Sequence, residues 1–239
     1  MLIYYLRQFP KFDPSGNAFG ISRTVRDQGG WRACFRRIAD RTSARLSPTC
    51  VEQDLANVIA LIERAKERAT PVLVGIDGRS GTGKSTFAVA LATATRALLI
   101  EGDAFYAGGA ALRRDTAQQR ADACIDRPKL RLTLRELKAG RATSYRAFDW
   151  DAFDGSLSNP AVLVQPREVI IVEGVYGCHP DLMDILDIKV LLRIPDALRE
   201  QRLVTREGSI GPWERQWHEA EDWYFSHLAV DATFDLILN

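Results

Sequence analysis

Residues 78–85 read GRSGTGKS and combine the chemical groups that bind a polyphosphate. Glycines let consecutive backbone N–H groups turn inward around an anion, and the N-terminus of a following helix adds a partial positive charge. In the spacing G-x-x-x-x-G-K-[ST], the lysine reaches the β- and γ-phosphates and the hydroxyl ligates Mg²⁺. We therefore predict a site for a nucleoside triphosphate and Mg²⁺ that is built by Gly78, Arg79, Ser80, Gly81, Thr82, Gly83, Lys84, Ser85 and Thr86.

Two carboxylates stand at the ends of other apolar runs. Asp103 follows LLIEG, and Glu173 ends VIIVE. Because parallel strands end at one edge of a sheet, where ligands bind, both are expected beside residues 78–85. A carboxylate at Asp103 can accept the proton of an acceptor hydroxyl, and one at Glu173 can hold the hydration shell of Mg²⁺. The structural alternatives are a turn or cap role for Asp103 and an ordinary strand-end role for Glu173.

Three arginines, Arg199, Arg202 and Arg206, lie on a predicted helix after the run DIKVLLRI. Arg202 and Arg206 are four residues apart and so share one face of that helix. Guanidinium groups in this position can close over the γ-phosphate and stabilise its equatorial charge. Solvated surface arginines are the alternative.

The elements that must position these residues alternate along the chain. Short apolar runs typical of buried parallel strands occupy residues 71–77, 97–100, 167–174, 187–194 and 234–238, and helical patterns occupy 51–69, 85–97, 134–138, 195–207 and 212–227. This alternation predicts an α/β fold of the P-loop NTPase type, with a doubly wound, mainly parallel sheet, helices on both faces and a small helical lid.

The composition separates a basic beginning from the rest of the chain. Residues 1–49 carry nine Lys or Arg against three Asp, whereas the whole chain has a formal net charge of +1. We expect a weakly structured extension over residues 1–48 and one kinase domain over 49–239. With no apolar run near the roughly 18 residues of a membrane helix, no export signal and no metal spacing among its four cysteines, the chain is expected to be cytoplasmic, without a nucleic acid or membrane partner.

In combination, these motifs resemble the uridine kinase and phosphoribulokinase group of P-loop kinases. The resemblance covers roughly residues 71–207 and rests on GIDGRSGTGKST, on DAFY, on LKAG before FDW, and on VIIVEGVYG. It implies that Asp103 is the base facing a sugar hydroxyl, that Tyr106 lines the acceptor pocket, and that Glu173 serves Mg²⁺. It further implies that Arg202 and Arg206 are arginines of a mobile lid.

The acceptor side departs from the uridine kinase pattern. Uridine kinases usually follow the aromatic-Asp-aromatic segment with a His and an Arg that contact the nucleoside, and Phe153 and Gly155 stand at the matching positions. The segment FDWDAFDG offers instead the carboxylates of Asp149, Asp151 and Asp154 to grip sugar hydroxyls, with Trp150 to stack on a ring; a solvated acidic loop is the alternative.

The overall prediction is an ATP-dependent kinase that phosphorylates a hydroxyl of a nucleoside or sugar-like acceptor. Catalysis would rest on Lys84 and Mg²⁺ at the phosphates and on Asp103 at the acceptor. A vitamin or sugar-acid acceptor remains open, as do GTP in place of ATP, the oligomeric state, and a nucleotide-hydrolysing regulatory protein. Guanine-reading N-K-x-D and transporter L-S-G-G-Q motifs are absent from the sequence.

Other conspicuous side chains are assigned to structure. Trp213, Trp217 and Tyr224 share one face of a predicted helix, which is typical of core packing. The three histidines have no metal-ligand spacing and are expected to be structural.

Deletion of residues 1–46 is expected to leave nucleotide binding and turnover nearly unchanged, because every motif lies beyond Pro71. The melting temperature and the affinity for Mg·ATP of the truncated protein check this. A large drop in either would show that the extension packs on the domain.

Overall fold

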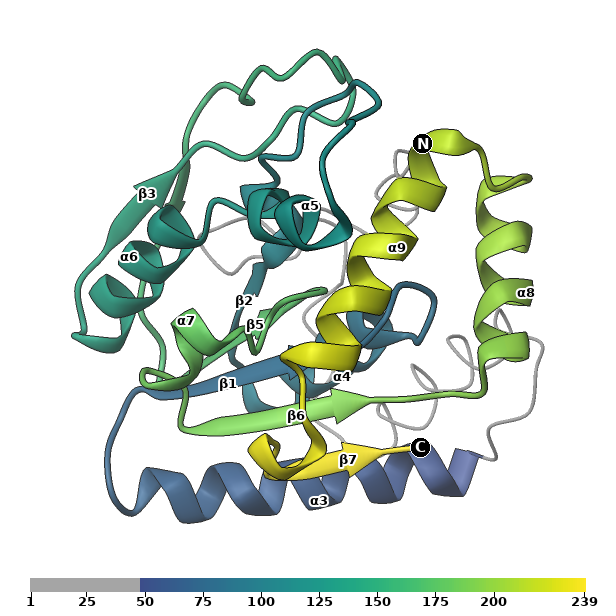
Figure 1. Cartoon of the computed structure of the whole chain (residues 1–239). Coiled ribbons are helices and arrows are strands. Elements are labelled where there is room, and N and C mark those ends of the chain that lie inside the picture. The colour runs from purple at the N-terminus through teal and green to yellow at the C-terminus, as the bar shows by residue number, and fades with distance from the viewer. Residues whose placement is uncertain (1–47) are drawn as a thin grey trace, which may run out of the picture.

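The computed structural model describes residues 48–239, so residues 1–47 of the predicted extension lie outside the described residues. Five parallel strands form the central sheet in the order β2-β5-β1-β6-β7 (Figure 1). They are β1 (Val72–Asp77), β2 (Leu98–Glu101), β5 (Val169–Glu173), β6 (Ile188–Leu192) and β7 (Leu236–Leu238). Each lies within or beside an apolar run that predicted it. The α/β fold with a parallel sheet is confirmed.

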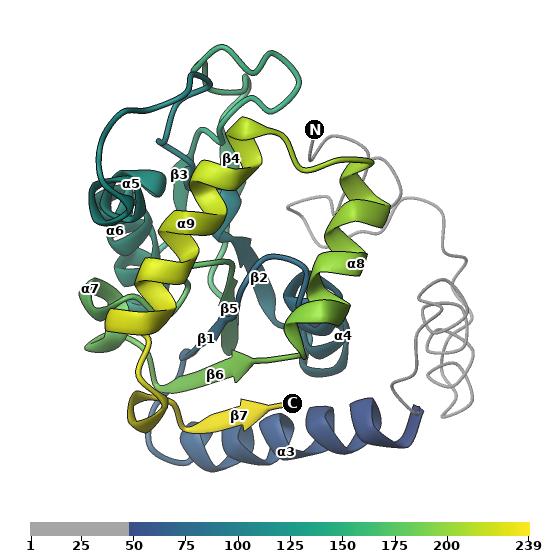
Figure 2. The same cartoon turned by 45° about the vertical axis from the view of Figure 1, so that its right-hand side comes forward.

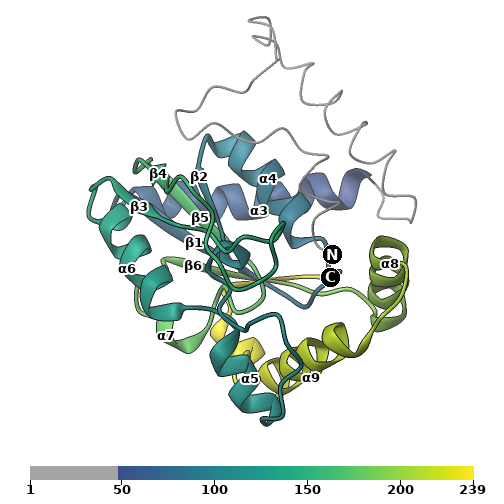
Figure 3. The ribbon, with the colours of Figure 1, turned by 90° about the horizontal axis from the view of Figure 1, so that it is seen from above.

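Both faces of this sheet are covered by helices, as Figure 3 shows from above. Side chains alternate along a strand, so Val72, Val74 and Ile76 of β1 pack against α3 (Pro48–Lys66) and α4 (Lys84–Thr95). Leu73 points to the opposite face, which α6 (Arg127–Lys138), α7 (Pro180–Met183) and α9 (Pro212–His227) cover. All six residues of β1 are therefore buried, which explains why residues 72–76, up to the terminal Asp77, form a continuous apolar run.

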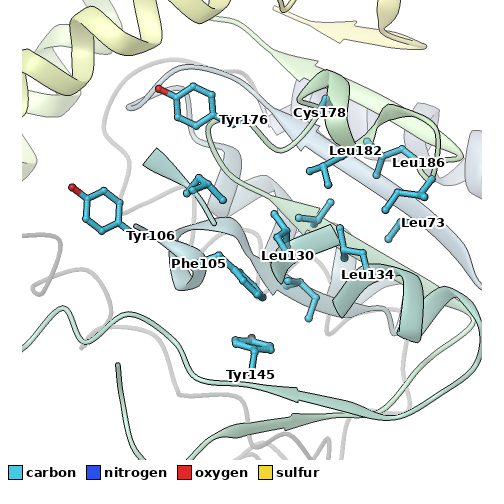
Figure 4. Packing of buried hydrophobic residues seen from close by; sticks show 14 of the residues in the cluster. Leu73, Phe105, Tyr106, Leu130, Leu134, Tyr145, Tyr176, Cys178, Leu182 and Leu186 are labelled. Atoms are coloured by element: carbon cyan, nitrogen blue, oxygen red, sulfur yellow. The ribbon is translucent and has the colours of Figure 1, made fainter. Parts of the chain in front are cut away.

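The core on the α6 side is partly aliphatic and partly aromatic (Figure 4). Leu130 and Leu134 of α6 pack toward Leu73 and Leu182, and all four are at most 2% exposed. At the other end of the cluster the hydroxyls of Tyr106 and Tyr176 point away from the aliphatic side chains. The aromatic end of this core lies at the carboxyl edge of the sheet, which is where the predicted site residues belong.

Several elements between β2 and β5 are missing from the sequence prediction. They are η1 (Gly102–Phe105), α5 (Ala117–Cys124) and the antiparallel pair of β3 (Thr143–Tyr145) and β4 (Val162–Val164). The helix predicted over 134–138 is the end of α6, which begins at Arg127. Asp126 caps α6 by accepting a hydrogen bond from the Lys129 amide at 3.0 Å, and Pro128 stands in its first turn. A capping box between Thr116 and Gln119 begins α5.

Two helices complete the carboxyl side of the sheet. Beyond the end of β6 the chain forms α8 (Asp196–Glu207) and then α9, which stand beside each other in Figures 1 and 2. After α9 the short η2 (Asp231–Thr233) returns the chain to β7 at the sheet edge. The bounds of α9 are those predicted from its pattern, and α8 begins one residue later than predicted.

Leu91→Ala is expected to lower the free energy of unfolding by about 2–5 kcal/mol, because it leaves a cavity in a packed core. Leu91 lies on α4 and is fully buried between that helix and the sheet. Leu132→Ala on α6 is the control, since Leu132 is 62% exposed and its truncation leaves no cavity. Urea unfolding of both variants measures the difference; equal effects would contradict the packing described.

Candidate active site

The phosphate-binding motif forms the turn between β1 and α4. Gly78, Gly81 and Gly83 have φ values of +149°, +86° and +97°, a region that side chains other than glycine rarely adopt. A Cβ on Gly78 would lie 2.5 Å from the carbonyl oxygen of Leu192. The loop is thus pressed against the end of β6 and curls into the first turn of α4, which begins at Lys84. This is the strand–loop–helix context that the sequence predicted for residues 78–86.

Lys84, Ser85 and Glu173 meet at this loop. The Lys84 ammonium donates a hydrogen bond to the carbonyl of Arg79 at 3.3 Å, and the Ser85 hydroxyl donates to Glu173 Oε2 at 3.2 Å. Glu173 ends β5, beside β1, and is 6% exposed. Burial raises the pKa of Glu173 to about 8; Lys84 opposes this, and Asp103 and Glu101 reinforce it.

These residues suit a hard divalent cation. A buried carboxylate whose pKa is raised gains most from a positive partner, and Ser85 contributes a second oxygen beside it. Among the described residues no three His, Cys, Asp or Glu side chains gather as a complete metal cage. Mg²⁺ takes few protein ligands and completes its shell with water and phosphate oxygens.

Asp103 lies in η1, directly after β2, at the same edge of the sheet. Gly102 brings η1 against β5, since a Cβ there would lie 3.1 Å from the Glu173 carbonyl oxygen. The residue is exposed, yet the protein around its carboxylate raises the pKa of Asp103 through desolvation. Lys84 and Arg206 lower that pKa and Glu221 raises it. The predicted base therefore lies within electrostatic reach of Lys84 in the glycine-rich loop and of Arg206, one of the predicted lid arginines.

The three predicted arginines of α8 occupy different positions. Arg202 donates to the backbone carbonyl of Thr82 at 3.3 Å, directly against the phosphate loop. Arg206 is exposed and its charge acts on Asp103. Arg199 is 7% exposed and is bound to Asp196 at 3.1 Å, so it is part of the helix packing. The placement of Arg202 and Arg206 on the site side of α8 is compatible with their predicted role.

A cluster of aromatic rings adjoins Asp103. The ring of Tyr106 lies 4.9 Å from those of Phe148 and Trp150 and 5.6 Å from that of Trp217, centroid to centroid. The Trp150 indole N–H donates to the Asp103 carbonyl at 3.3 Å, which fixes this ring beside the predicted base. Phe153 stacks on Trp150 at 6.1 Å. Tyr106 and Trp150, both predicted to bind the acceptor, are therefore brought together.

The acidic loop 149–154 uses much of its hydrogen-bonding capacity on its own backbone. Asp149 Oδ1 accepts from the amides of Asp151 and Ala152, each at 3.0 Å, and Asp154 Oδ1 accepts from Ser156 at 2.9 Å. Asp151 is exposed. These bonds shape the turn that carries Trp150 and Phe153, whose φ of +47° is uncommon for a phenylalanine.

The contacts of α9 with the phosphate loop are not predicted from the sequence. Glu221 accepts hydrogen bonds from Ser80, Asp222 forms an ion pair with Arg79, and the Tyr224 hydroxyl donates to Asp77 at 2.8 Å. One signal was available. Glu221 follows Trp217 by four residues, so an acid stands within an apolar helical stripe, where a buried charge needs a partner.

The remaining residues assigned to structure agree with that assignment. His179 caps α7 by accepting from the Asp181 amide at 3.2 Å, and burial lowers its pKa to about 4. Trp217 and Tyr224 are 7% and 0% exposed in the core. Among residues 48–239, no helix is long and apolar enough to cross a membrane.

A glycine-rich phosphate loop lies between a buried strand and a helix, with the carboxylate of Asp103 at the end of the next strand along the chain and arginines on a following helix. This combination is typical of a P-loop phosphotransferase that acts on a hydroxyl acceptor. Residues 73–209 match the phosphoribulokinase / uridine kinase family, and the chain belongs to that family.

Individual relatives agree with this assignment. The uridine kinase of Streptococcus uberis is 29% identical over 150 residues, which cover 59% of this chain and 69% of that protein. A structure described as a possible uridine kinase from Bacillus stearothermophilus aligns with a TM-score of 0.56 at 19% identity, covering 77% of this chain and 100% of its own. D-glycerate 3-kinase from Cryptococcus neoformans aligns with a TM-score of 0.55 at 15% identity, covering 75% and 88%. The structural alignments show a shared fold.

Lys84→Ala is expected to abolish phosphoryl transfer without unfolding the protein. Lys84 contacts the loop carbonyl of Arg79 and lies within reach of the two carboxylates at the sheet edge, so its loss removes charge from the site and little from the core. Turnover and melting temperature are measured on one preparation, with Lys66→Ala on α3 as a surface lysine control. Retained turnover in a folded Lys84→Ala protein is the contrary result.

Proposed function

We propose that the chain is an ATP- and Mg²⁺-dependent kinase that transfers the γ-phosphate to a hydroxyl of a nucleoside or a related sugar-like acceptor. One observation carries the proposal. Asp103 lies at the strand end next to the phosphate loop, where Lys84 and Arg206 act on its charge and Trp150 binds its backbone carbonyl. We call the cluster of Tyr106, Phe148, Trp150, Phe153 and Trp217 the aromatic wall. The Asp103 carboxylate lies between the phosphate site and this wall, so it can act on a substrate that binds against the wall.

The proposed reaction is an in-line displacement. Asp103 orients the acceptor hydroxyl and takes its proton, while the acceptor oxygen forms a bond to the γ-phosphorus. The bond from that phosphorus to the β–γ bridging oxygen breaks, and ADP leaves with the electron pair. The raised pKa of Asp103 strengthens it as a proton acceptor in the transition state.

Charge neutralisation completes the catalytic roles. Lys84 and the inward amides of the loop hold the phosphates, and Arg202 and Arg206 stabilise the equatorial oxygens from α8. Ser85 and Glu173 would hold Mg²⁺, which supplies further neutralisation of the phosphate charge when bound. We include residues 49–239 in the kinase domain. We also propose a cytoplasmic location, which agrees with the free thiols of Cys124 and Cys178.

Aromatic stacking dominates the acceptor site in this proposal. Trp150 and Phe153 are the partly exposed rings, and Tyr106, which is 7% exposed, packs against Trp150 from the core. Asp149 and Asp154 accept hydrogen bonds from the backbone of their own loop. A ring-bearing acceptor such as a nucleoside suits such a wall, in keeping with the uridine kinases among the relatives. Phe153 and Gly155 offer no side-chain hydrogen bond to a pyrimidine, so these positions do not restrict the nucleobase of the acceptor to uracil.

A sugar-acid acceptor, as the name of the aligned D-glycerate 3-kinase suggests, is the second candidate. A carboxylate substrate requires a cation at the wall. Arg113, on the loop after Tyr106, is engaged by Asp115 in an ion pair, which favours a neutral acceptor. A vitamin with a ring and a hydroxyl also suits the aromatic wall.

A panel of nucleosides, sugar acids and hydroxylated vitamins tests the acceptor class through ADP release. A kinase releases ADP only when a suitable hydroxyl compound is added, and we expect the largest response from a ring-bearing compound. ADP release that is fast and indifferent to every addition would favour the alternative, a nucleotide-hydrolysing regulatory protein.

Asp103→Asn is expected to lower turnover by roughly 10²-fold or more, the usual scale for loss of a positioned general base, while Mg·ATP affinity stays within a few-fold. Asparagine keeps the shape of aspartate, so packing does not explain such a loss. Glu101→Gln is the matched control, because it removes a neighbouring exposed carboxylate at the end of the same strand. ATP binding, melting temperature and turnover are measured together. Unchanged turnover with lowered stability would assign Asp103 to structure.

A further inference from the structure

The inward face of α9 joins two parts of the site that are far apart in the sequence. Trp213, Trp217, Glu221 and Tyr224 follow one another at helical spacing on this face. The first two belong to the aromatic cluster around Tyr106, and the last two contact the phosphate loop and the end of β1. Figure 2 shows α9 as a single helix that runs along this side of the molecule toward the sheet.

Glu221 makes the most direct contact between α9 and the phosphate loop. Its carboxylate accepts from the backbone amide of Ser80 at 2.9 Å and from the Ser80 hydroxyl at 2.5 Å. Only 6% of Glu221 is exposed, and hydrogen bonds to a buried carboxylate are strong. A side-chain anion from α9 thus orients two donors of a loop whose function is to bind an anion.

Neighbouring contacts fix the register of α9 against the loop. Asp222 pairs with Arg79, the residue before Ser80, and Phe225 lies under the same guanidinium at 5.7 Å. The Tyr224 hydroxyl binds Asp77, directly before the loop, at 2.8 Å. Because consecutive loop positions are each tied to α9, a shift of the helix along its axis would displace the loop with it.

Glu221 also acts on the charge of a residue on the proposed acceptor side of the site. Its charge is close enough to raise the pKa of Asp103, the proposed base. In an in-line transfer the γ-phosphate lies between the loop and that base. Glu221 therefore contacts the loop through Ser80 and also acts on the charge of the proposed base.

We infer that Glu221 is a positioning residue that sets the conformation of the phosphate loop through Ser80 and couples that loop, along α9, to the acceptor wall at Trp217. This inference rests on the proposed nucleotide site, and it adds that the Glu221–Ser80 contact controls the conformation of that site. A nucleotide that binds at the loop changes the surroundings of Trp217, because Glu221 and Trp217 are one helical turn apart on α9. In the same way, an acceptor that packs on the aromatic wall changes the conformation of the loop at Ser80.

Glutamine and alanine at position 221 separate positioning from simple packing. Glu221→Gln keeps an oxygen that accepts from Ser80, whereas Glu221→Ala leaves both Ser80 donors without this partner. Glu219→Gln is the matched control on the same helix, because Glu219 is an exposed acid that pairs with Arg120. The probes are Mg·ADP and Mg·AMP-PNP, so no acceptor needs to be known.

We expect Glu221→Ala to bind both nucleotides at least about fivefold more weakly than the wild type, with Glu221→Gln recovering most of the loss, since the oriented donor is a hydrogen-bonding contact. Ser80→Ala loses only the hydroxyl and keeps the backbone amide, so its nucleotide affinity should lie between those of the wild type and Glu221→Ala. The double variant should be no weaker than Glu221→Ala, because the residues act through one contact. Ser80→Ala also keeps the test usable if Glu221→Ala does not fold.

Tryptophan emission tests the coupling to the acceptor wall. The part of the nucleotide-induced change that Trp217→Phe removes is assigned to Trp217, whose buried indole N–H has no partner among the described residues, so that phenylalanine breaks no bond seen there. This part should be present in the wild type, Glu221→Gln and Glu219→Gln, and lost in Glu221→Ala.

Either of two results would overturn this inference and leave the proposed function intact. One is a folded Glu221→Ala protein with wild-type affinity for both nucleotides, and the other is a Trp217 signal that is absent from the wild type or unchanged in Glu221→Ala. If the wild type binds neither nucleotide, the proposed function fails and this inference fails with it.

Discussion

A buried carboxylate at the end of β1 is the constraint on which the site depends. Asp77 is fully buried, and four donors hold it: the amides of Gly78, Tyr176 and Cys178 at 2.7, 3.2 and 3.0 Å and the Tyr224 hydroxyl at 2.8 Å. Burial raises the pKa of Asp77, and the hydrogen bonds from Cys178, Tyr224 and Gly78 oppose the rise. A charge in this position is tolerated only when its partners are in place, so it joins the phosphate loop, the chain after β5 and α9 in one arrangement.

The parallel sheet converts this junction into a site. Because β1, β2 and β5 are neighbours that point the same way, Lys84, Asp103 and Glu173 arrive at one edge from three separate segments of the chain. Glycines at positions 78 and 102 allow these segments to approach, since a side chain at either would meet a neighbouring carbonyl. The result is that the Lys84 ammonium lies near the carboxylates of Asp103 and Glu173, an arrangement that suits the phosphates and Mg²⁺ of the proposed reaction.

The sequence predicted the parts of this structure that are specified locally. The strands are continuous apolar runs because both faces are covered, and the phosphate loop is specified by glycines that its φ values require. The region between β2 and β5 was predicted poorly. Helix α5 has only eight residues, and the pairing of β3 with β4 spans a long loop, so neither leaves a strong periodic pattern.

The role of Glu221 depends on a contact across 141 residues, which no local pattern contains. The same limit applies to the acceptor. Tyr106 and Trp150 are predicted from the sequence to bind the acceptor, whereas their partners Phe153 and Trp217 join them only in the folded chain. Stacking surfaces are assembled from several segments, and their shape follows from packing that spacing alone does not define.

Phosphorus NMR of the products tests the central claim most directly. The protein is incubated with Mg·ATP and the pool of hydroxylated compounds that supports ADP release. If the γ-phosphate passes to an acceptor hydroxyl at the Asp103 edge of the sheet, a new phosphomonoester resonance grows in step with ADP, and inorganic phosphate stays at background. ADP that is matched only by inorganic phosphate would contradict the account, because water would then be the acceptor.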